Sequence, residues 1–185
     1  AAAMRALGDK ITSKLLAEKA GVPVTAWSGG ALSDPDHALA EAERIGFPVV
    51  IKATAGGGGR GIRVVHTAAD LPAAFRSAGS EALAAFGNGS LFCEKLVQAP
   101  PPALSRELRD ALESAAVRLA REVSYVGVGT VEFLLAGSDF FFLEVNPRLQ
   151  VEHGITEEIT GLDLVQLQLR IARGESIGAV VIKEH

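Results

Sequence analysis

The residues of this chain with the clearest chemical potential lie in one short stretch, from 142 to 153. Carboxylate, amide and guanidinium side chains recur there at every second position. Side chains two apart in an extended strand point to the same face, so the spacing predicts one strand with a dense polar face. A solvated surface strand would show the same spacing, but the alternate positions are apolar and need a core, which favours the wall of a cleft. The polar positions are Glu144, Asn146, Arg148, Gln150 and Glu152.

A second carboxylate, Glu132, lies upstream in the strand-like run 129–135, and the run 137–139 between the two strands is typical of a hairpin turn. A hairpin would bring Glu132 beside Glu144. Two adjacent carboxylates repel each other unless a cation lies between them. Because Mg²⁺ prefers carboxylate and phosphate oxygens, the pair predicts a Mg²⁺ (or Mn²⁺) site.

A glycine-rich run follows Lys52, and it contains the pattern G-x-G-x-x-G at Gly56, Gly58 and Gly61. A dinucleotide-binding fingerprint should open a helix, whereas the residues 62–65 resemble a strand. No Gly-Lys-Ser/Thr is present, which excludes a Walker A loop. We therefore expect a hairpin loop whose backbone N–H groups approach phosphate oxygens, with Lys52 as a point charge. A disordered glycine turn is the alternative.

The composition limits the function classes. The chain has 185 residues, of which 48% are hydrophobic, so a sizeable core is expected. A net charge of -4 disfavours nucleic-acid binding through a basic surface, and no apolar run is long enough to span a membrane. The one cysteine, Cys93, excludes an internal disulfide framework. It lies in a strand-like run and is expected to be a buried packing residue in a protein of the cytoplasm.

Strand and helix patterns alternate along the chain, which predicts an α+β fold. Three regions are expected: 1–26 as a helix leading into the fold, 27–97 as a small lobe with the glycine loop, and 98–185 as a larger lobe. The prolines 100–102 are the candidate boundary. The expected helices are 7–20, 33–45, 70–84, 105–121 and 162–173. The expected strands are 24–27, 47–52, 62–66, 90–97 and 129–135, followed by the polar strand.

Together these segments resemble the ATP-grasp domain of biotin carboxylase, and the resemblance covers most of the chain. It implies an ATP-grasp fold with two lobes and nucleotide between them, without the family's N- and C-terminal domains. The ending Arg-Leu-Gln-Val-Glu-His is the most specific part, because other ATP-grasp ligases lack it. The matching segments are Gly8–Lys10, Val50–Ala53, Gly56–Gly61, Glu94–Lys95, Gly129–Phe133, Glu144–His153, Ile155–Glu157 and Thr160–Leu164.

The resemblance also implies roles for individual residues. The residues implied to contact the ATP phosphates are Lys10, Lys52, Gly56, Gly57, Gly58, Gly59 and Gly61. The residues implied to hold adenine and ribose are Glu94, Lys95 and Val97. The residues implied to bind the metal are Glu132, Glu144 and Asn146. The residues implied to hold bicarbonate are Arg148, Gln150 and Val151. Glu152 is implied to be the base, and Arg148 is also implied to stabilise the biotin enolate.

The implied reaction is ATP-dependent carboxylation of carrier-bound biotin with bicarbonate. The implied partners are a biotin carboxyl carrier domain or protein, a carboxyltransferase and further copies of the chain, with no nucleic acid and no membrane. One departure matters: the family has a few dozen more residues after Glu94–Lys95, and here Val97 runs almost directly into the prolines. We expect that segment to be missing between Val97 and Ala99. A non-catalytic nucleotide-binding remnant and another ATP-grasp ligase are the alternatives.

Overall fold

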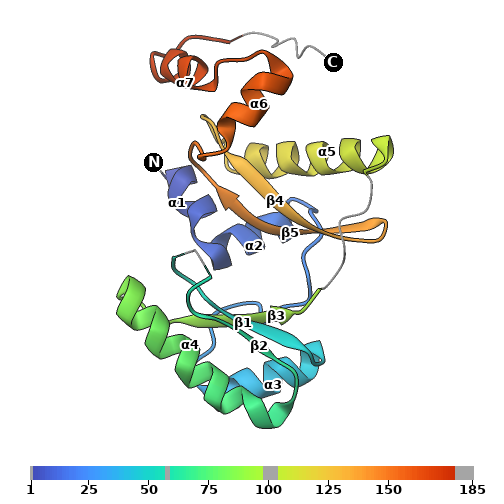
Figure 1. Ribbon diagram of the computed structural model, residues 1–185, viewed down its shortest axis with the longest axis vertical. Helices are drawn as coiled ribbons and strands as arrows, with labels where there is room; N and C mark the ends of the chain where they lie inside the picture. The colour runs from blue at the N-terminus through green and yellow to red at the C-terminus, as the bar shows by residue number, and fades with distance from the viewer. Residues whose placement is uncertain (1, 57–58, 98–103, 178–185) are drawn as a thin grey trace.

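The computed structural model describes residues 2–56, 59–97 and 104–177, and these residues form two antiparallel sheets with helices packed on them (Figure 1). The arrangement confirms the predicted α+β class. The helices are α1 (Ala2–Gly8), α2 (Lys10–Lys19), α3 (Pro35–Ile45), α4 (Leu71–Phe86), α5 (Arg106–Glu122), α6 (His153–Thr160) and α7 (Leu164–Ala172). The strands are β1 (Val49–Ala53), β2 (Ile62–Val65), β3 (Leu91–Lys95), β4 (Thr130–Ala136) and β5 (Asp139–Asn146).

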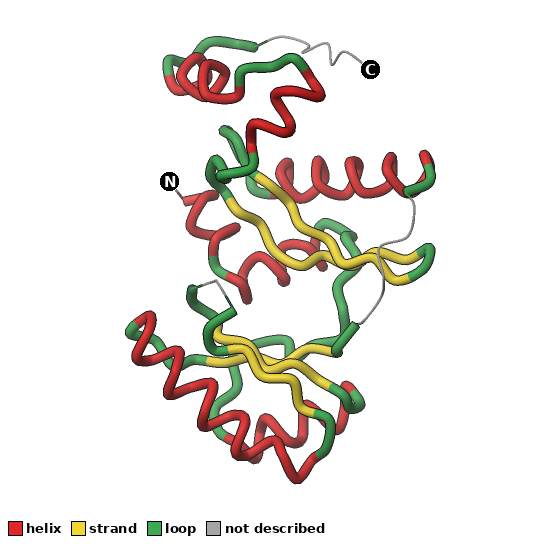
Figure 2. The backbone as a smooth tube through the Cα atoms, in the orientation of Figure 1, coloured by secondary structure: helices red, strands yellow, loops and turns green. Residues whose placement is uncertain are grey.

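The first sheet has three strands in the order β2-β1-β3, and both pairings are antiparallel. Alternate side chains of β1 therefore face opposite sides. One side packs on α3 and α4, as Figure 2 shows, and forms a buried apolar core. The opposite side carries Lys52 of β1 and Glu94 of β3. The buried core on the side of α3 and α4 includes Val49, Ile51, Ala53, Val65, Leu71, Leu91 and Cys93.

Cys93 is fully buried in that core. Burial raises the pKa of its thiol to about 11, so the thiol stays protonated near neutral pH. This confirms the prediction that Cys93 is a packing residue rather than a nucleophile.

The second sheet is the hairpin of β4 and β5, covered by α1, α2 and α5. A register shift follows Glu132: it pairs with Glu144, whereas the next residue, Phe133, pairs with Phe142. The extra residue of this bulge changes the alternation of β5. Phe142 and Val145, three residues apart, consequently both point into the core of this half.

One short segment contacts both sheets. Val24 bridges to Phe142 of β5, and Trp27 bridges to Glu94 of β3. The expected strand 24–27 is thus replaced by isolated bridges, one to each half of the molecule. This segment and α2, which precedes it, join the two sheets.

The predicted polar strand from 144 to 152 is wrong beyond Asn146, where β5 ends. Pro147 has no backbone N–H to continue the ladder. The next N–H, of Arg148, donates back to the carbonyl oxygen of Asn146 at 2.8 Å. Arg148, Gln150 and Glu152 therefore do not share a strand face with Glu144.

Two helix predictions are also corrected. The helix expected from 7 to 20 is two helices, because Asp9 interrupts the first and caps α2 by accepting from the N–H of Thr12 at 2.8 Å. The helix α6 was not predicted. The last helix starts later than expected, since Asp163 is the N-cap of α7 and accepts from the N–H of Gln166.

The proline boundary and the expected missing segment after Val97 fall on residues 98–103, which lie outside the described residues. The three expected domain ranges remain a prediction. Among the described helices, none combines the length and the apolar character that crossing a membrane requires.

The glycine loop is held against α4 at both of its ends. A Cβ at Gly56 would lie 2.3 Å from the Phe86 ring, and a Cβ at Gly61 would lie 2.8 Å from the Cβ of Ala53. The Gly61 N–H also donates to Glu81 Oε2 at 3.0 Å. The return strand β2 follows directly, as predicted, and no helix opens at Gly61.

We predict that Gly61→Ala destabilises the chain more than Gly59→Ala does. Both glycines have positive φ, +68° and +77°, but only Gly61 has close neighbours. The left-handed backbone costs an alanine about 1–2 kcal/mol at either site. The collision with Ala53 adds about 1–3 kcal/mol at Gly61 alone. Urea unfolding of the two variants measures the difference, and equal losses would contradict the close packing of this loop end.

Candidate functional site

The hairpin places two carboxylates side by side. Glu132 and Glu144 are directly opposite in the strand register, so their side chains leave the same face of the sheet, as predicted. Asn146 Nδ2 donates to Glu132 Oε1 at 2.7 Å. Lys10 Nζ, at the start of α2, lies 3.5 Å from Glu144 Oε2. The structure thus brings together four of the side chains singled out by sequence.

These residues fit a magnesium ion that shares its shell with phosphate. The two carboxylates and the amide oxygen of Asn146 are hard oxygen donors, and the Asn146 bond to Glu132 uses only its nitrogen. Within the described residues, no group of three or more His, Cys, Asp and Glu side chains could hold a metal. Mg²⁺ typically takes one or two carboxylates and completes its shell with water and phosphate.

A second charged cluster is buried at the face of the three-stranded sheet. Glu94, 3% exposed, pairs through Oε1 with Lys52 and through Oε2 with Lys14, whose Nζ is 2.7 Å away. Burial by itself would raise the pKa of Glu94. The charges of Lys52 and Lys14 outweigh that effect and hold the pKa of this carboxyl below its ordinary value.

Lys14 is a member of this cluster that the sequence reasoning missed. It is 1% exposed, and its ammonium group lies 5.6 Å from the centre of the Trp27 ring. A usable signal was present, because Lys14 follows Lys10 by four residues and so lies on the same helix face. One face of α2 therefore carries both lysines, one for each carboxylate site.

The residues expected at adenine and ribose lie at the end of β3. Lys95 turns its ammonium group to the carbonyl oxygens of Gly46 and Phe47, at 2.8 and 3.0 Å. Its backbone N–H donates to Ala26. Val97 is half-buried just after the strand.

The expected phosphate-binding loop is only partly described. Gly57 and Gly58 lie outside the described residues, and the N–H of Gly61 already donates to Glu81. Hydrogen bonds from Gly61 and Arg63 hold the pKa of Glu81 below its ordinary value. Gly56 and Gly59 both have positive φ. A phosphate-binding role stays a prediction for the loop glycines.

Two of the residues expected at bicarbonate line one cavity of about 450 Å³. Gln150 and Glu152 contribute to it, together with Thr130, His153 and apolar side chains of α7. Glu152 is the N-cap residue of α6, but its carboxylate makes no capping hydrogen bond. The exposed carboxylate is therefore not tied to the helix it precedes.

Arg148 and Val151 do not share in that cavity. The Arg148 guanidinium is exposed and donates to the carbonyl oxygen of Leu149 at 3.2 Å, and Val151 is 96% exposed. His153 Nδ1 lies 2.8 Å from the carbonyl oxygen of Gln150. A carbonyl only accepts, so this contact requires a proton on Nδ1, and it agrees with a hydrogen-bonded structural histidine.

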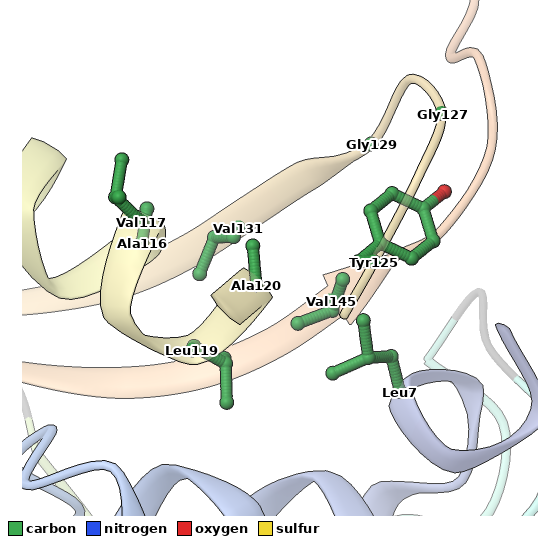
Figure 3. Close-up of a pocket in the computed structure, with 10 residues that line it drawn as sticks. All are labelled: Leu7, Ala116, Val117, Leu119, Ala120, Tyr125, Gly127, Gly129, Val131 and Val145. Atoms are coloured by element: carbon green, nitrogen blue, oxygen red, sulfur yellow. The ribbon is translucent and has the colours of Figure 1, made fainter. Parts of the chain in front are cut away.

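A further cavity, of about 230 Å³, lies between α5 and the hairpin (Figure 3). Apolar side chains and glycines line it, and its one polar side chain, Tyr125, donates its hydroxyl to the carbonyl oxygen of Val128 at 2.8 Å. Among the described residues no charged side chain lines it, so it offers no carboxylate, ammonium or imidazole group to a substrate or metal. The candidate chemistry lies with the two charged clusters and the cavity at Glu152.

The chain belongs to the family described as carbamoyl-phosphate synthase L chain, ATP binding domain. The match covers residues 9–99 and 94–180, in two pieces that overlap at residues 94–99, where the sequence analysis expects a missing segment. The biotin carboxylase of Nostoc sp. is 39% identical over 225 aligned positions, covering 99% of this chain and 50% of that protein. Since 225 exceeds the 185 residues of the chain, that relative carries residues without a counterpart here. The pyruvate carboxylase of Bacillus subtilis is 41% identical, over 92% of this chain and 18% of that protein.

Solved structures of biotin carboxylases match this chain as well. A biotin carboxylase–βγ-ATP complex from Campylobacter jejuni matches with a TM-score of 0.94 at 36% identity, over 98% of this chain and 50% of that one. The biotin carboxylase domain of the Hydrogenobacter thermophilus 2-oxoglutarate carboxylase, a dimer with MgADP, ADP and bicarbonate, matches at 0.92 and 35%, over 98% and 49%. These matches confirm the predicted resemblance and the ATP-grasp fold. The chain spans about half the length of the biotin carboxylases it matches.

We predict that acid weakens the wild-type chain partly through Glu94. A carboxyl whose pKa is lowered by folding stabilises the folded state above its ordinary value, here 4.5, and this stabilisation is lost as the pH falls through the lower folded value. The variant Lys14→Met/Glu94→Gln lacks this contribution. The free energy of unfolding should therefore fall more in the wild type than in this variant as the pH falls below 4.5. A difference that stays constant from pH 7 to pH 3 would contradict the lowered pKa.

Proposed function

We propose that this chain is the ATP-grasp core of a biotin carboxylase, which uses ATP and bicarbonate to carboxylate biotin on a carrier and yields ADP and phosphate. The observation that carries the proposal is the arrangement along α2. Lys10 contacts Glu144, the partner of Glu132 in the hairpin, and Lys14 contacts Glu94, which also pairs with Lys52 in the glycine-loop sheet. Lysines that could bind phosphate and carboxylates that could bind a metal are thus brought together from the hairpin half and the glycine-loop half of the molecule.

The phosphates of ATP would lie between these two clusters. Lys52 and Lys10 each place an ammonium group on a rigid element, a strand and a helix start, where they can stabilise negative charge on the phosphates. Glu132, Glu144 and Asn146 would hold Mg²⁺, which when bound neutralises charge on the transferring phosphoryl group. Positioning and electrostatic stabilisation are the main protein contributions to this class of reaction.

Bicarbonate would bind near Gln150 and Glu152. An oxygen of bicarbonate attacks the γ-phosphorus, the bond to ADP breaks, and the proton of bicarbonate moves to Glu152. The Gln150 amide can donate to the anion. A guanidinium has five N–H donors, so the Arg148 contact to Leu149 leaves donors for bicarbonate and for the biotin enolate.

The relatives support the cofactors and partners of this proposal. One related structure is a dimer with MgADP and bicarbonate, and one related protein is a pyruvate carboxylase of which this chain covers only 18%. We extend these to the present chain: ATP and Mg²⁺ as ligands, a biotin carrier and a carboxyltransferase as partners, and self-association. We also propose a cytoplasmic location, because the one cysteine, Cys93, is a free buried thiol, which fits a reducing compartment.

A second candidate function is nucleotide binding without turnover. It is favoured by the residues that the Nostoc relative has and this chain lacks, since lost sheet or substrate contacts would impair catalysis. Under this alternative the protein binds MgATP but shows no cleavage that depends on bicarbonate. Measuring both properties on the full-length protein separates the two candidates.

We predict that Glu152→Gln in the full-length protein lowers bicarbonate-dependent ATP cleavage by about 10²–10⁴-fold and leaves ATP affinity nearly unchanged. Glutamine keeps the shape of the side chain but cannot take a proton. Glu158→Gln, at an exposed position of α6, is the matched control and should keep full activity. ATPase rates with and without bicarbonate and free biotin provide the measurement. Wild-type turnover in Glu152→Gln would remove Glu152 from the mechanism.

A further inference from the structure

We infer that Lys14 is a positioning residue for the phosphate site: by neutralising Glu94, it lets Lys52 act as a net cation toward a polyphosphate. The inference rests on the proposed function, in which Lys52 receives phosphate oxygens. It adds a role for a buried lysine that does not itself reach the nucleotide.

The geometry assigns one lysine to each oxygen of the Glu94 carboxylate. Lys14 contacts Oε2 and Lys52 contacts Oε1. The two lysines differ in exposure: the side chain of Lys14 is 2% exposed and that of Lys52 is 16% exposed. Only Lys52 can therefore meet a ligand from solvent.

The charges of this cluster do not cancel. Two ammonium groups and one carboxylate leave a net charge of +1, and the accessible member of the cluster is Lys52. Without Lys14, Lys52 and Glu94 would form a neutral pair in a poorly solvated place, where the attraction between them is strong. A phosphate oxygen would then have to compete with Glu94 for Lys52.

The surroundings hold Lys14 in this role. The Thr25 hydroxyl donates to Glu94 Oε2 at 3.3 Å and accepts from Lys14 Nζ at 3.4 Å. The Trp27 ring covers the ammonium group and packs edge-on against Phe92. A structural ion pair at this place needs only one lysine. Taking a second lysine out of water is costly, and a purely structural role leaves that cost unexplained.

The test measures the affinity of the full-length protein for tripolyphosphate, ATP and adenosine by calorimetry. In Lys14→Met we expect tripolyphosphate and ATP to bind at least about tenfold more weakly, because one net charge is lost near the phosphates. Adenosine should bind within about twofold of wild type, because it carries no phosphate. A role limited to packing would weaken all three ligands alike.

The variant Lys14→Met/Glu94→Gln is the decisive control, because it removes one positive and one negative charge and leaves Lys52 as a net cation. We expect it to recover tripolyphosphate affinity to within about threefold of wild type. If Lys14→Met does not fold, the tripolyphosphate affinity of this double variant tests the inference by itself. A double variant as weak as Lys14→Met, or a Lys14→Met chain that keeps wild-type affinity, would overturn the inference.

Two further outcomes separate the inference from the proposed function. A wild-type chain that binds no tripolyphosphate overturns the inference, since Lys52 then offers no site for phosphate. If the affinities follow the expected pattern but the full-length protein shows no bicarbonate-dependent ATP cleavage, the catalytic proposal is overturned. The inference about Lys14 then still holds.

Discussion

The organisation of this protein depends on two lysines one helical turn apart on α2. Lys10 reaches a carboxylate of the hairpin, and Lys14 reaches a carboxylate of the three-stranded sheet. A helix fixes the spacing of such a pair to a few ångströms, because residues four apart are surface neighbours. The helix therefore sets the distance between the Glu132/Glu144 face of the hairpin and the Glu94/Lys52 face of the three-stranded sheet.

Burying charge at such a junction is costly unless each charge has a partner. The three ionised groups around Glu94 meet this condition with Thr25, and within the described residues no buried side-chain nitrogen or oxygen lacks a hydrogen-bond partner. The apolar cores lie on the outer side of the three-stranded sheet and between the hairpin and the helices α1, α2 and α5. The charged contacts of Lys10 and Lys14 lie on α2 and the segment after it, where the two halves are joined.

The sequence predicted the parts of this site that local chemistry determines. Turn residues and alternating polarity were enough to predict the hairpin and the Glu132/Glu144 pair, and the strand after Gly61 excluded a dinucleotide fold. The strand end was missed because apolar alternation continues through Val151, whereas the missing N–H of Pro147 decides where pairing stops. Helix α6 was missed as well, although Gly161 ends it in the left-handed conformation typical of a helix C-terminus.

The helical spacing from Lys10 could have placed Lys14 on the same face of α2, but it could not have identified Glu94 as the partner of Lys14, because Glu94 lies 80 positions away in the chain and their contact exists only in the folded molecule. A crystal structure of the chain with Mg²⁺ and a non-hydrolysable ATP analogue is the most direct test of the site as a whole. We expect metal bound to Glu132 and Glu144, with phosphate oxygens at Lys10 and Lys52. Nucleotide on another surface, or phosphates that contact neither lysine, would contradict this assignment.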